Sequence, residues 1–296
     1  MIFTEGPVFG RLLTAMVTPF DPELALDLDA AAELARYLVD DLGNDGLVIN
    51  GTTGEAPTTT DQEKVALLRA VVAAVGDRAS VVAGVGTFDT RHTIEAVAAA
   101  REAGADGALV VTPYYNRPPQ SGLIAHFTAV ADASELPIMI YDIPKRTGTP
   151  VETSTMIEIA GHRRIVAVKD AKGDLTASAQ VLAATDLLYY AGDDAMTLPL
   201  LSIGGVGVVG TSTHFSGRGT KQLIHAFLDG KIDEAVRLHQ ALLPIYTGVF
   251  ATQGCILVKA GLESRGHPVG GLRSPMVGAT DDERAALQQA LTAAGL

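Results

Sequence analysis

The sequence predicts an α/β fold, a closed (β/α)8 TIM barrel with a C-terminal helical subdomain. Short apolar runs alternate with longer alanine-rich runs over residues 1–230, with eight of each. Eight β–α repeats in one chain favour a closed barrel over an open doubly wound sheet. No GxGxxG motif opens the first crossover, so a nucleotide-binding sheet loses its main support.

The predicted strands are apolar on consecutive residues, as expected where a parallel sheet is covered on both faces. They span residues 12–18, 46–50, 80–86, 108–112, 137–143, 165–169, 187–192 and 205–211. The predicted helices carry apolar residues three and four apart, and they begin near Asp29, Asp61, Thr90, Ser121, Glu152, Asp174, Asp194 and Ser216. The Thr-x-x-Glu pattern predicts capping boxes at Thr60 and Thr280.

The alternation stops after residue 230, and only helices are predicted beyond it, over 232–246, 249–264 and 281–294. We therefore predict two units: a barrel over residues 1–230, with the active site at the C-terminal ends of its strands, and a helical subdomain over 231–296. The apolar faces of these last helices need a partner, so we expect them to pack on the flank of the barrel. They are also candidates for joining barrels in an oligomer.

Composition excludes several classes of function. The net charge of −12 argues against binding to nucleic acid or to an anionic membrane surface, because both need clustered Lys and Arg. The single cysteine, Cys255, cannot form an internal disulfide or a multi-cysteine metal site. No His pair has a metal-binding spacing such as His-Glu-x-x-His. No apolar run reaches the roughly 18 residues of a membrane span, so we expect a soluble, cytoplasmic protein without a metal.

Lys169 ends the sixth predicted strand, directly after four apolar residues. One interpretation is that it is the first solvated residue beyond a strand. The other places it at the mouth of the barrel, where apolar walls lower the pKa of the amine and let it attack a ketone. Lys172 is a second candidate nucleophile, but it lies in the following loop beside Gly173, and we expect it to be solvated.

Polar residues also follow three other strands. Gly51-Thr52-Thr53-Gly54 after the second strand suits a small carboxylate, because two glycines allow a tight turn of backbone N–H groups and hydroxyls. An ordinary turn before a helix explains it equally well. Tyr114 and Tyr115 follow the fourth strand, where packing is the alternative role. Tyr141 and Arg146 end the fifth, where Arg146 suits an anionic substrate.

These groups form a coherent set for imine chemistry. A lysine amine attacks the ketone of a keto acid, and the cationic imine lets the neighbouring carbon react as an enamine. Each step moves protons, so phenols and hydroxyls have a purpose. No cofactor is expected beyond the covalent imine itself.

The chain resembles the dihydrodipicolinate synthase and N-acetylneuraminate lyase family of class I aldolases. The resemblance covers nearly the whole chain, including the helical tail. It rests on Gly51-Thr-Thr-Gly-Glu55, Thr112-Pro-Tyr-Tyr-Asn-Arg-Pro118, Tyr141-Asp-Ile-Pro-Lys-Arg-Thr-Gly148, Val168-Lys-Asp-Ala171, Gly192-Asp-Asp-Ala195, Gly204-Gly-Val-Gly207, Val258-Lys-Ala-Gly261 and Leu272-Arg-Ser-Pro-Met276.

The resemblance implies a role for each matching residue. Lys169 forms the Schiff base with pyruvate, and Thr53, Tyr141 and Tyr115 form the proton relay. Tyr115 reaches into the site of a neighbouring subunit, and Tyr114 stacks at the same tight dimer interface. The substrate-binding residues are Thr52 and Thr53 for the pyruvate carboxylate, Arg146 for the carboxylate of the second substrate, and Gly192 and Val209 for the pocket wall. The implied assembly is a homotetramer, a dimer of tight dimers.

Two features resemble the synthase branch more than the lyases: the Thr-Thr pair of the turn, and Arg146. They imply condensation of pyruvate with L-aspartate 4-semialdehyde to 4-hydroxy-tetrahydrodipicolinate, in lysine and diaminopimelate synthesis. Gly210 and Thr211 depart from the pattern of many synthases, so another pyruvate-dependent aldolase or dehydratase, acting on a sugar acid or 2-keto acid, stays open. A barrel without catalysis is a more remote alternative.

Regulation can also be predicted from the resemblance. In feedback-inhibited relatives, lysine binds between subunits through His, Asn and Glu residues. The matching positions here are Asp61, Lys64, Phe88 and His92. A cationic Lys64 and an aromatic Phe88 are poor receptors for lysine, so we predict weak or absent inhibition.

Two other polar sites have structural explanations. We expect His214, near the barrel mouth, to make a structural hydrogen bond. The pair Asp193-Asp194 could suggest a cation site, but a helix cap explains it better.

Overall fold

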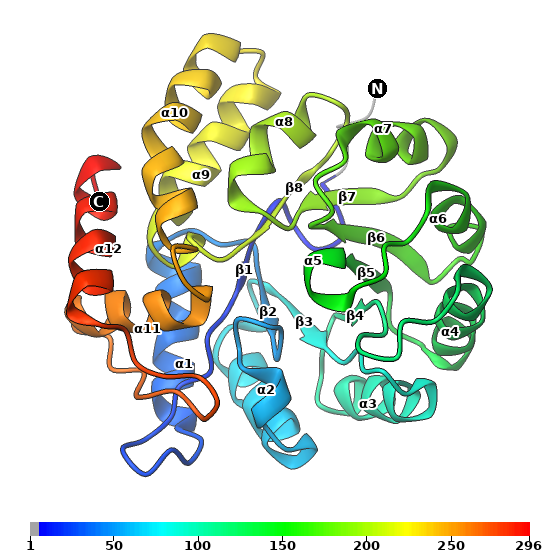
Figure 1. Cartoon of the computed structure of the whole chain (residues 1–296), viewed down its shortest axis with the longest axis horizontal. Coiled ribbons are helices and arrows are strands. Elements are labelled where there is room, and N and C mark those ends of the chain that lie inside the picture. Colours follow the sequence, from blue (N-terminus) through cyan, green and yellow to red (C-terminus); the bar gives the residue numbers. More distant parts are fainter. Residues whose placement is uncertain (1–5) are drawn as a thin grey trace.

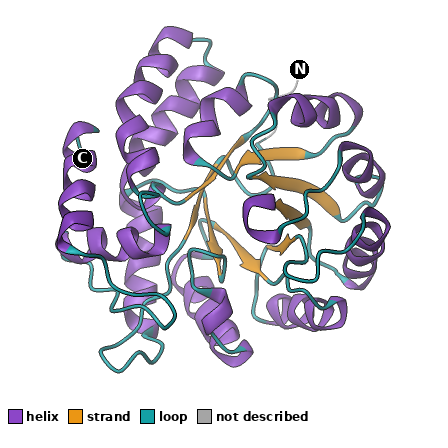
Figure 2. Ribbon diagram, viewed as in Figure 1, coloured by secondary structure: helices purple, strands orange, loops and turns teal. Residues whose placement is uncertain are grey.

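In the computed structural model, which describes residues 6–296, eight parallel strands close into one barrel in sequence order. The predicted fold is confirmed. The strands are β1 (Leu12–Ala15), β2 (Gly46–Ile49), β3 (Ser80–Gly84), β4 (Gly107–Val111), β5 (Ile138–Asp142), β6 (Ile165–Asp170), β7 (Leu188–Ala191) and β8 (Gly207–Gly210). Figure 2 shows them at the centre of the molecule with helices around them.

The helices that follow the strands cover the outside of the barrel, except the four-residue helix α5 (Pro144–Thr147), which lies over its mouth (Figure 1). They are α1 (Leu28–Arg36), α2 (Asp61–Val75), α3 (Thr90–Glu102), α4 (Gln120–Ala133), α5 (Pro144–Thr147), α6 (Thr153–Ile159), α7 (Leu175–Ala184), α8 (Thr197–Leu201) and α9 (Thr213–Leu228). Short helical segments at Tyr37–Asp41, Ala56–Thr58 and Asp194–Met196 complete this set. Both predicted capping boxes are present, at Thr60 and Thr280.

Two hydrophobic cores result from the alternation of side chains along the strands. The inner one fills the barrel and includes Leu13, Val48, Tyr141, Tyr190 and Val209. The outer one lies between the strands and the surrounding helices. The inner core fills the space below the C-terminal ends of the strands, so any site must lie above it, at the mouth.

Three helices follow the barrel: α10 (Ile232–Gly248), α11 (Gly254–Ser264) and α12 (Asp281–Ala293). Helix α10 packs along α9, and α12 packs on α10 and α11 (Figure 1). Their apolar residues belong to the same core as the helices of the barrel. The division at residue 230 stays a prediction.

The predicted start of α11 at residue 249 was wrong, because Val249 is the C-cap of α10 and the new helix begins at Gly254. The Gln253 side chain accepts a hydrogen bond from the Cys255 N–H and caps the helix there.

No helix among residues 6–296 has the length and apolarity needed to cross a membrane.

Candidate active site

Lys169 lies on β6 and points into the barrel mouth. It is paired in register with Tyr141 on β5 and with Tyr190 on β7. Only 5% of its surface is exposed, which excludes the interpretation as a solvated strand-end lysine. Burial lowers the pKa of the Lys169 amine to about 8; the nearby Asp194 carboxylate opposes this shift, and the Arg146 guanidinium adds to it.

Tyr141 is an aromatic neighbour of this amine. The Lys169 Nζ lies 4.4 Å from the centre of the Tyr141 ring. Burial raises the pKa of the Tyr141 phenol to about 12, while Arg146 and a hydrogen bond with the Thr52 side chain oppose that rise. The phenol therefore stays protonated at neutral pH and can pass a proton to or from a bound substrate.

The loop after β2 brings two hydroxyls to the mouth. Thr53 is buried, and its Oγ1 lies 3.3 Å from the Oγ1 of Thr211, at the end of β8. Thr52 contacts the Tyr141 side chain, as described above. The sequence predicted both threonines as substrate ligands, but the contact from Thr53 to Thr211 was not predicted.

Arg146 lies on α5, a four-residue helix over the barrel mouth (Figure 1). Pro144 begins this helix and Gly148, at a φ of 76°, ends it. The arginine side chain is exposed, and its charge lowers the pKa of both Lys169 and Tyr141. A cation therefore faces solvent above the buried amine.

Gly192 and Val209 lie on neighbouring sides of the mouth. Gly192 follows β7, and its N–H donates to the Asp170 carbonyl at 2.7 Å. A Cβ at Gly192 would lie 2.9 Å from the Cβ of Ala171, so a side chain there would crowd the end of β6. Val209 is fully buried and packs in the same inner core as Tyr141.

Tyr115 does not join the site of its own chain. Its side chain is 93% exposed, and its φ of 69° is unusual for a bulky residue. Tyr114 beside it packs edge-on against Phe88, with ring centres 5.4 Å apart. The predicted role of Tyr115 in a neighbouring subunit therefore stays a prediction.

Two neighbours of Lys169 were not predicted as parts of its surroundings. Tyr190 flanks Lys169 from β7, and its hydroxyl donates to the Gly10 carbonyl at the opposite end of the barrel. Asp194 is fully buried and accepts hydrogen bonds from the Thr211 and Ser212 N–H groups at 3.0 and 3.1 Å. Burial raises the pKa of the Asp194 carboxyl, and hydrogen bonding to Ser212 opposes this rise.

The capping explanation of the acidic pair therefore holds for Asp193 only. The Asp193 side chain accepts from the Ala195 N–H at 3.1 Å. The sequence could not predict the partners of Asp194, because they lie 17 and 18 residues further along the chain.

Two other expectations concern groups near the mouth. His214 makes structural hydrogen bonds as predicted, with the Val17 N–H at 3.2 Å and the Thr211 carbonyl at 2.8 Å. The expectation that Lys172 is solvated was wrong. Its side chain is 18% exposed, and its Nζ lies 3.7 Å from the Asp142 carboxylate. An ammonium held in this ion pair is a poor nucleophile.

A cavity of about 440 Å³ meets the site at Thr52, Tyr141 and Arg146 and extends outward between α2 and α3. Asp61, Lys64 and His92 line its outer part. His92 and Lys64 both pair with Asp61: the His92 Nε2 lies 2.8 Å and the Lys64 Nζ 3.5 Å from the Asp61 carboxylate. Among residues 6–296, no group of three or more His, Cys, Asp or Glu side chains could hold a metal ion.

Fold and site together define a class of protein. It is a (β/α)8 barrel with a desolvated lysine at the C-terminal ends of its strands and protonated hydroxyls around that lysine. Such a lysine suits imine formation with a carbonyl substrate.

Comparison with known proteins identifies the family. The model of the dihydrodipicolinate synthetase family matches residues 8–294. The 4-hydroxy-tetrahydrodipicolinate synthase of Acidothermus cellulolyticus is 64% identical over 97% of this chain and 93% of its own. That of Cutibacterium acnes is 62% identical over 94% and 95%. The chain belongs to the dihydrodipicolinate synthetase family.

Solved structures agree with this assignment. A crystal structure of the enzyme from Cyanidioschyzon merolae with lysine bound has a TM-score of 0.95 and 42% sequence identity. It covers 98% of this chain and 99% of the other.

Proposed function

We propose that the chain condenses pyruvate with L-aspartate 4-semialdehyde to 4-hydroxy-tetrahydrodipicolinate, in lysine and diaminopimelate synthesis. It acts as a lyase of the Schiff-base-forming type. The observation that carries the proposal is the Lys169 amine, which is buried against Tyr141 with its pKa lowered to about 8. The relatives named as 4-hydroxy-tetrahydrodipicolinate synthases support the choice of substrates.

The first half of the reaction builds a nucleophile from pyruvate. The neutral Lys169 amine attacks the ketone carbon, and loss of water leaves a cationic imine. Removal of a proton from the methyl carbon then gives an enamine. Thr52 and Thr53 hold the carboxylate of pyruvate, and the Tyr141 phenol passes the protons. The lysine itself supplies the electron sink, so no separate cofactor takes part.

The second half joins the aldehyde. The enamine carbon attacks the aldehyde carbon of the semialdehyde, and the resulting alkoxide takes up a proton. The amino group of the semialdehyde then displaces Lys169 and closes the ring. Arg146 binds the carboxylate of the semialdehyde at the mouth, because its guanidinium is exposed there and close enough to lower the pKa of Lys169.

The active assembly in this proposal is a homotetramer built as a dimer of tight dimers. Tyr115 supports this assembly, because a 93% exposed tyrosine cannot serve the buried amine of its own chain. Placed at a two-fold interface, it would complete the proton relay of the neighbouring site.

A coupled assay tests the function. Purified protein with pyruvate and L-aspartate 4-semialdehyde should form product at a rate that depends on both substrates. N-acetylneuraminate should not be cleaved under the same conditions, and Lys169→Ala should be inactive. Turnover of N-acetylneuraminate without turnover of the semialdehyde would contradict the proposal.

A further inference from the structure

The loop after β2 carries Thr52 and Thr53, and it lies beyond the paired residues of the β2 strand. It is a tight turn, in which the Gly54 N–H donates to the Gly51 carbonyl at 3.1 Å and the Glu55 N–H donates to the Thr52 carbonyl at 3.2 Å. Glu55 has a φ of 56°, a conformation that costs a non-glycine residue energy. Surrounding contacts must therefore hold this turn in place.

Glu55 is held by the C-terminal part of the chain. Its carboxylate lies 2.8 Å from the Nζ of Lys259 on α11, and both side chains are almost fully buried. The same carboxylate accepts a hydrogen bond from the Arg273 N–H at 3.0 Å. The Lys259 Nζ also donates to the Gly271 carbonyl at 2.6 Å. The contacts of Glu55 with Lys259 and Arg273 tie the turn to residues more than two hundred positions further along the chain.

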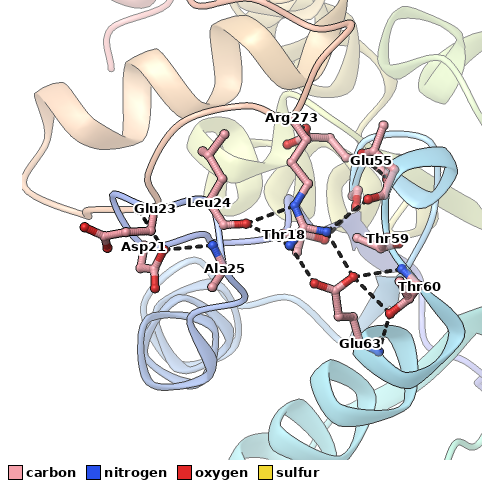
Figure 3. A network of polar contacts seen from close by, with 12 residues as sticks. Thr18, Asp21, Glu23, Leu24, Ala25, Glu55, Thr59, Thr60, Glu63 and Arg273 are labelled. Carbon is pink, nitrogen blue, oxygen red and sulfur yellow. Dashed lines mark hydrogen bonds and ion pairs between the residues drawn. The ribbon is translucent and has the colours of Figure 1, made fainter.

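A second ion pair lies beside the first. The guanidinium of Arg273 binds Glu63 on α2 through both carboxylate oxygens, at 2.6 and 2.9 Å, and donates to the carbonyls of Leu24 and Thr58 (Figure 3). The Phe20 ring lies close to both cations, 4.2 Å from the Lys259 Nζ and 4.3 Å from the Arg273 guanidinium. These contacts fix the chain at Glu55 and at Thr58, between the two threonines and α2.

We propose that Glu55 and Lys259 are positioning residues for pyruvate: their buried ion pair anchors the β2 loop to α11 and so sets the positions of Thr52 and Thr53. The inference rests on the proposed function, because it assigns the substrate carboxylate to that loop. Neither residue touches the substrate. A tight turn moves as one unit, so a shift of Glu55 shifts the two threonines that precede it.

The position of the pair argues against a role in stability alone. A buried ion pair is costly to desolvate, and an apolar pair of similar volume would often stabilise a fold as well. Here the pair stands two residues from Thr53, and Gly254 at the start of α11 comes near Thr211, the partner of Thr53. Helix α11 therefore comes near the hydroxyl cluster at Gly254 and contacts the loop of Thr52 and Thr53 through Lys259.

The test uses a double variant that removes both charges, Glu55→Gln with Lys259→Met. It leaves no buried unpaired charge, so it should fold even if Lys259→Met alone does not. Arg284→Met is the matched control, because it removes an exposed ion pair between α12 and α11. For all proteins, one measures the thermal midpoint, kcat, and KM for pyruvate and for the semialdehyde. One also measures the rate at which borohydride traps pyruvate on Lys169.

The double variant should raise the KM for pyruvate about tenfold or more, since small misplacements of binding groups are costly. Trapping at low pyruvate should slow in proportion. The KM for the semialdehyde should change much less, because its proposed anchor, Arg146, lies on α5 and not on the loop. Arg284→Met should change neither value.

A folded double variant with an unchanged KM for pyruvate would overturn the inference. Equal increases in both KM values would overturn it too, because they would indicate general loosening. The proposed function fails separately: in that case the unaltered protein would not turn over pyruvate with the semialdehyde, whereas failure of the inference leaves that turnover intact.

Discussion

The chemistry of Lys169 depends on what surrounds its side chain. Burial between Tyr141 and Tyr190 disfavours the ammonium form and lowers the pKa to about 8. The Asp194 carboxylate works in the opposite direction, and three hydrogen bonds from the β8–α9 turn hold it in place. The amine therefore keeps a useful neutral fraction near neutral pH without losing its charge entirely.

The lowered pKa predicts a pH dependence for imine formation. A lysine reacts as the neutral amine, so the rate should rise about tenfold per pH unit below the pKa and level off above it. With a pKa of about 8, the plateau should begin near pH 8. Trapping rates at low pyruvate, measured between pH 6 and 10, check this. A rate still rising steeply at pH 10 would indicate an ordinary exposed lysine.

Arg146→Met should have two effects. It removes the proposed anchor for the carboxylate of the semialdehyde, so the KM for that substrate should rise by about tenfold to a hundredfold, the value of a charge-assisted hydrogen bond. It also removes a cation that lowers the pKa of Lys169, so the trapping profile should move to higher pH. Steady-state kinetics and the pH series measure the two effects separately. An unchanged KM for the semialdehyde would exclude the anchor role.

At the scale of elements, apolar runs and caps predicted most of the fold. Strand β1 was predicted too long, because Met16 and Val17 are buried after they leave the ladder. Helix α5 was missed because Pro-Lys-Arg-Thr has no apolar periodicity. The site residues were predicted from their places at strand ends and from the family resemblance. The ion pair between α11 and the β2 loop was not predicted, because it joins residues far apart in sequence.

The ion pair between Lys259 and Glu55 also predicts an effect on stability. Lys259→Met leaves the Glu55 carboxylate buried without its partner, which should lower the free energy of unfolding by about 3–5 kcal/mol. The double variant with Glu55→Gln should recover much of this loss. Denaturant unfolding with a common slope measures both. If the single and double variants lost the same free energy of unfolding, the unpaired buried charge would be excluded as the cause of the loss.

At the scale of the whole molecule, the outer part of the cavity bears on regulation. Asp61 pairs with both His92 and Lys64, and Phe88 is 54% exposed. This leaves a cation where a lysine ligand would bring its own ammonium groups. We therefore expect little loss of activity at millimolar lysine. A steady-state assay with lysine at saturating and limiting pyruvate checks this, and strong inhibition would contradict it.

Mixing two inactive variants tests whether Tyr115 acts between subunits. In a hybrid of Lys169→Ala and Tyr115→Phe chains, one site would combine an intact lysine with an intact tyrosine from the neighbour. Random mixing after unfolding and refolding should then restore up to about one quarter of the activity per chain. Each variant refolded alone is the control. If Tyr115 served its own chain, no mixture would recover activity.

The position of the imine on the chain can be measured directly. Protein incubated with pyruvate and borohydride, then digested and analysed by mass spectrometry, should carry one reduced pyruvate on Lys169. Lys172, held by Asp142, should stay unmodified. An adduct on Lys172, or no adduct at all, would contradict the claim that the buried lysine of β6 is the nucleophile.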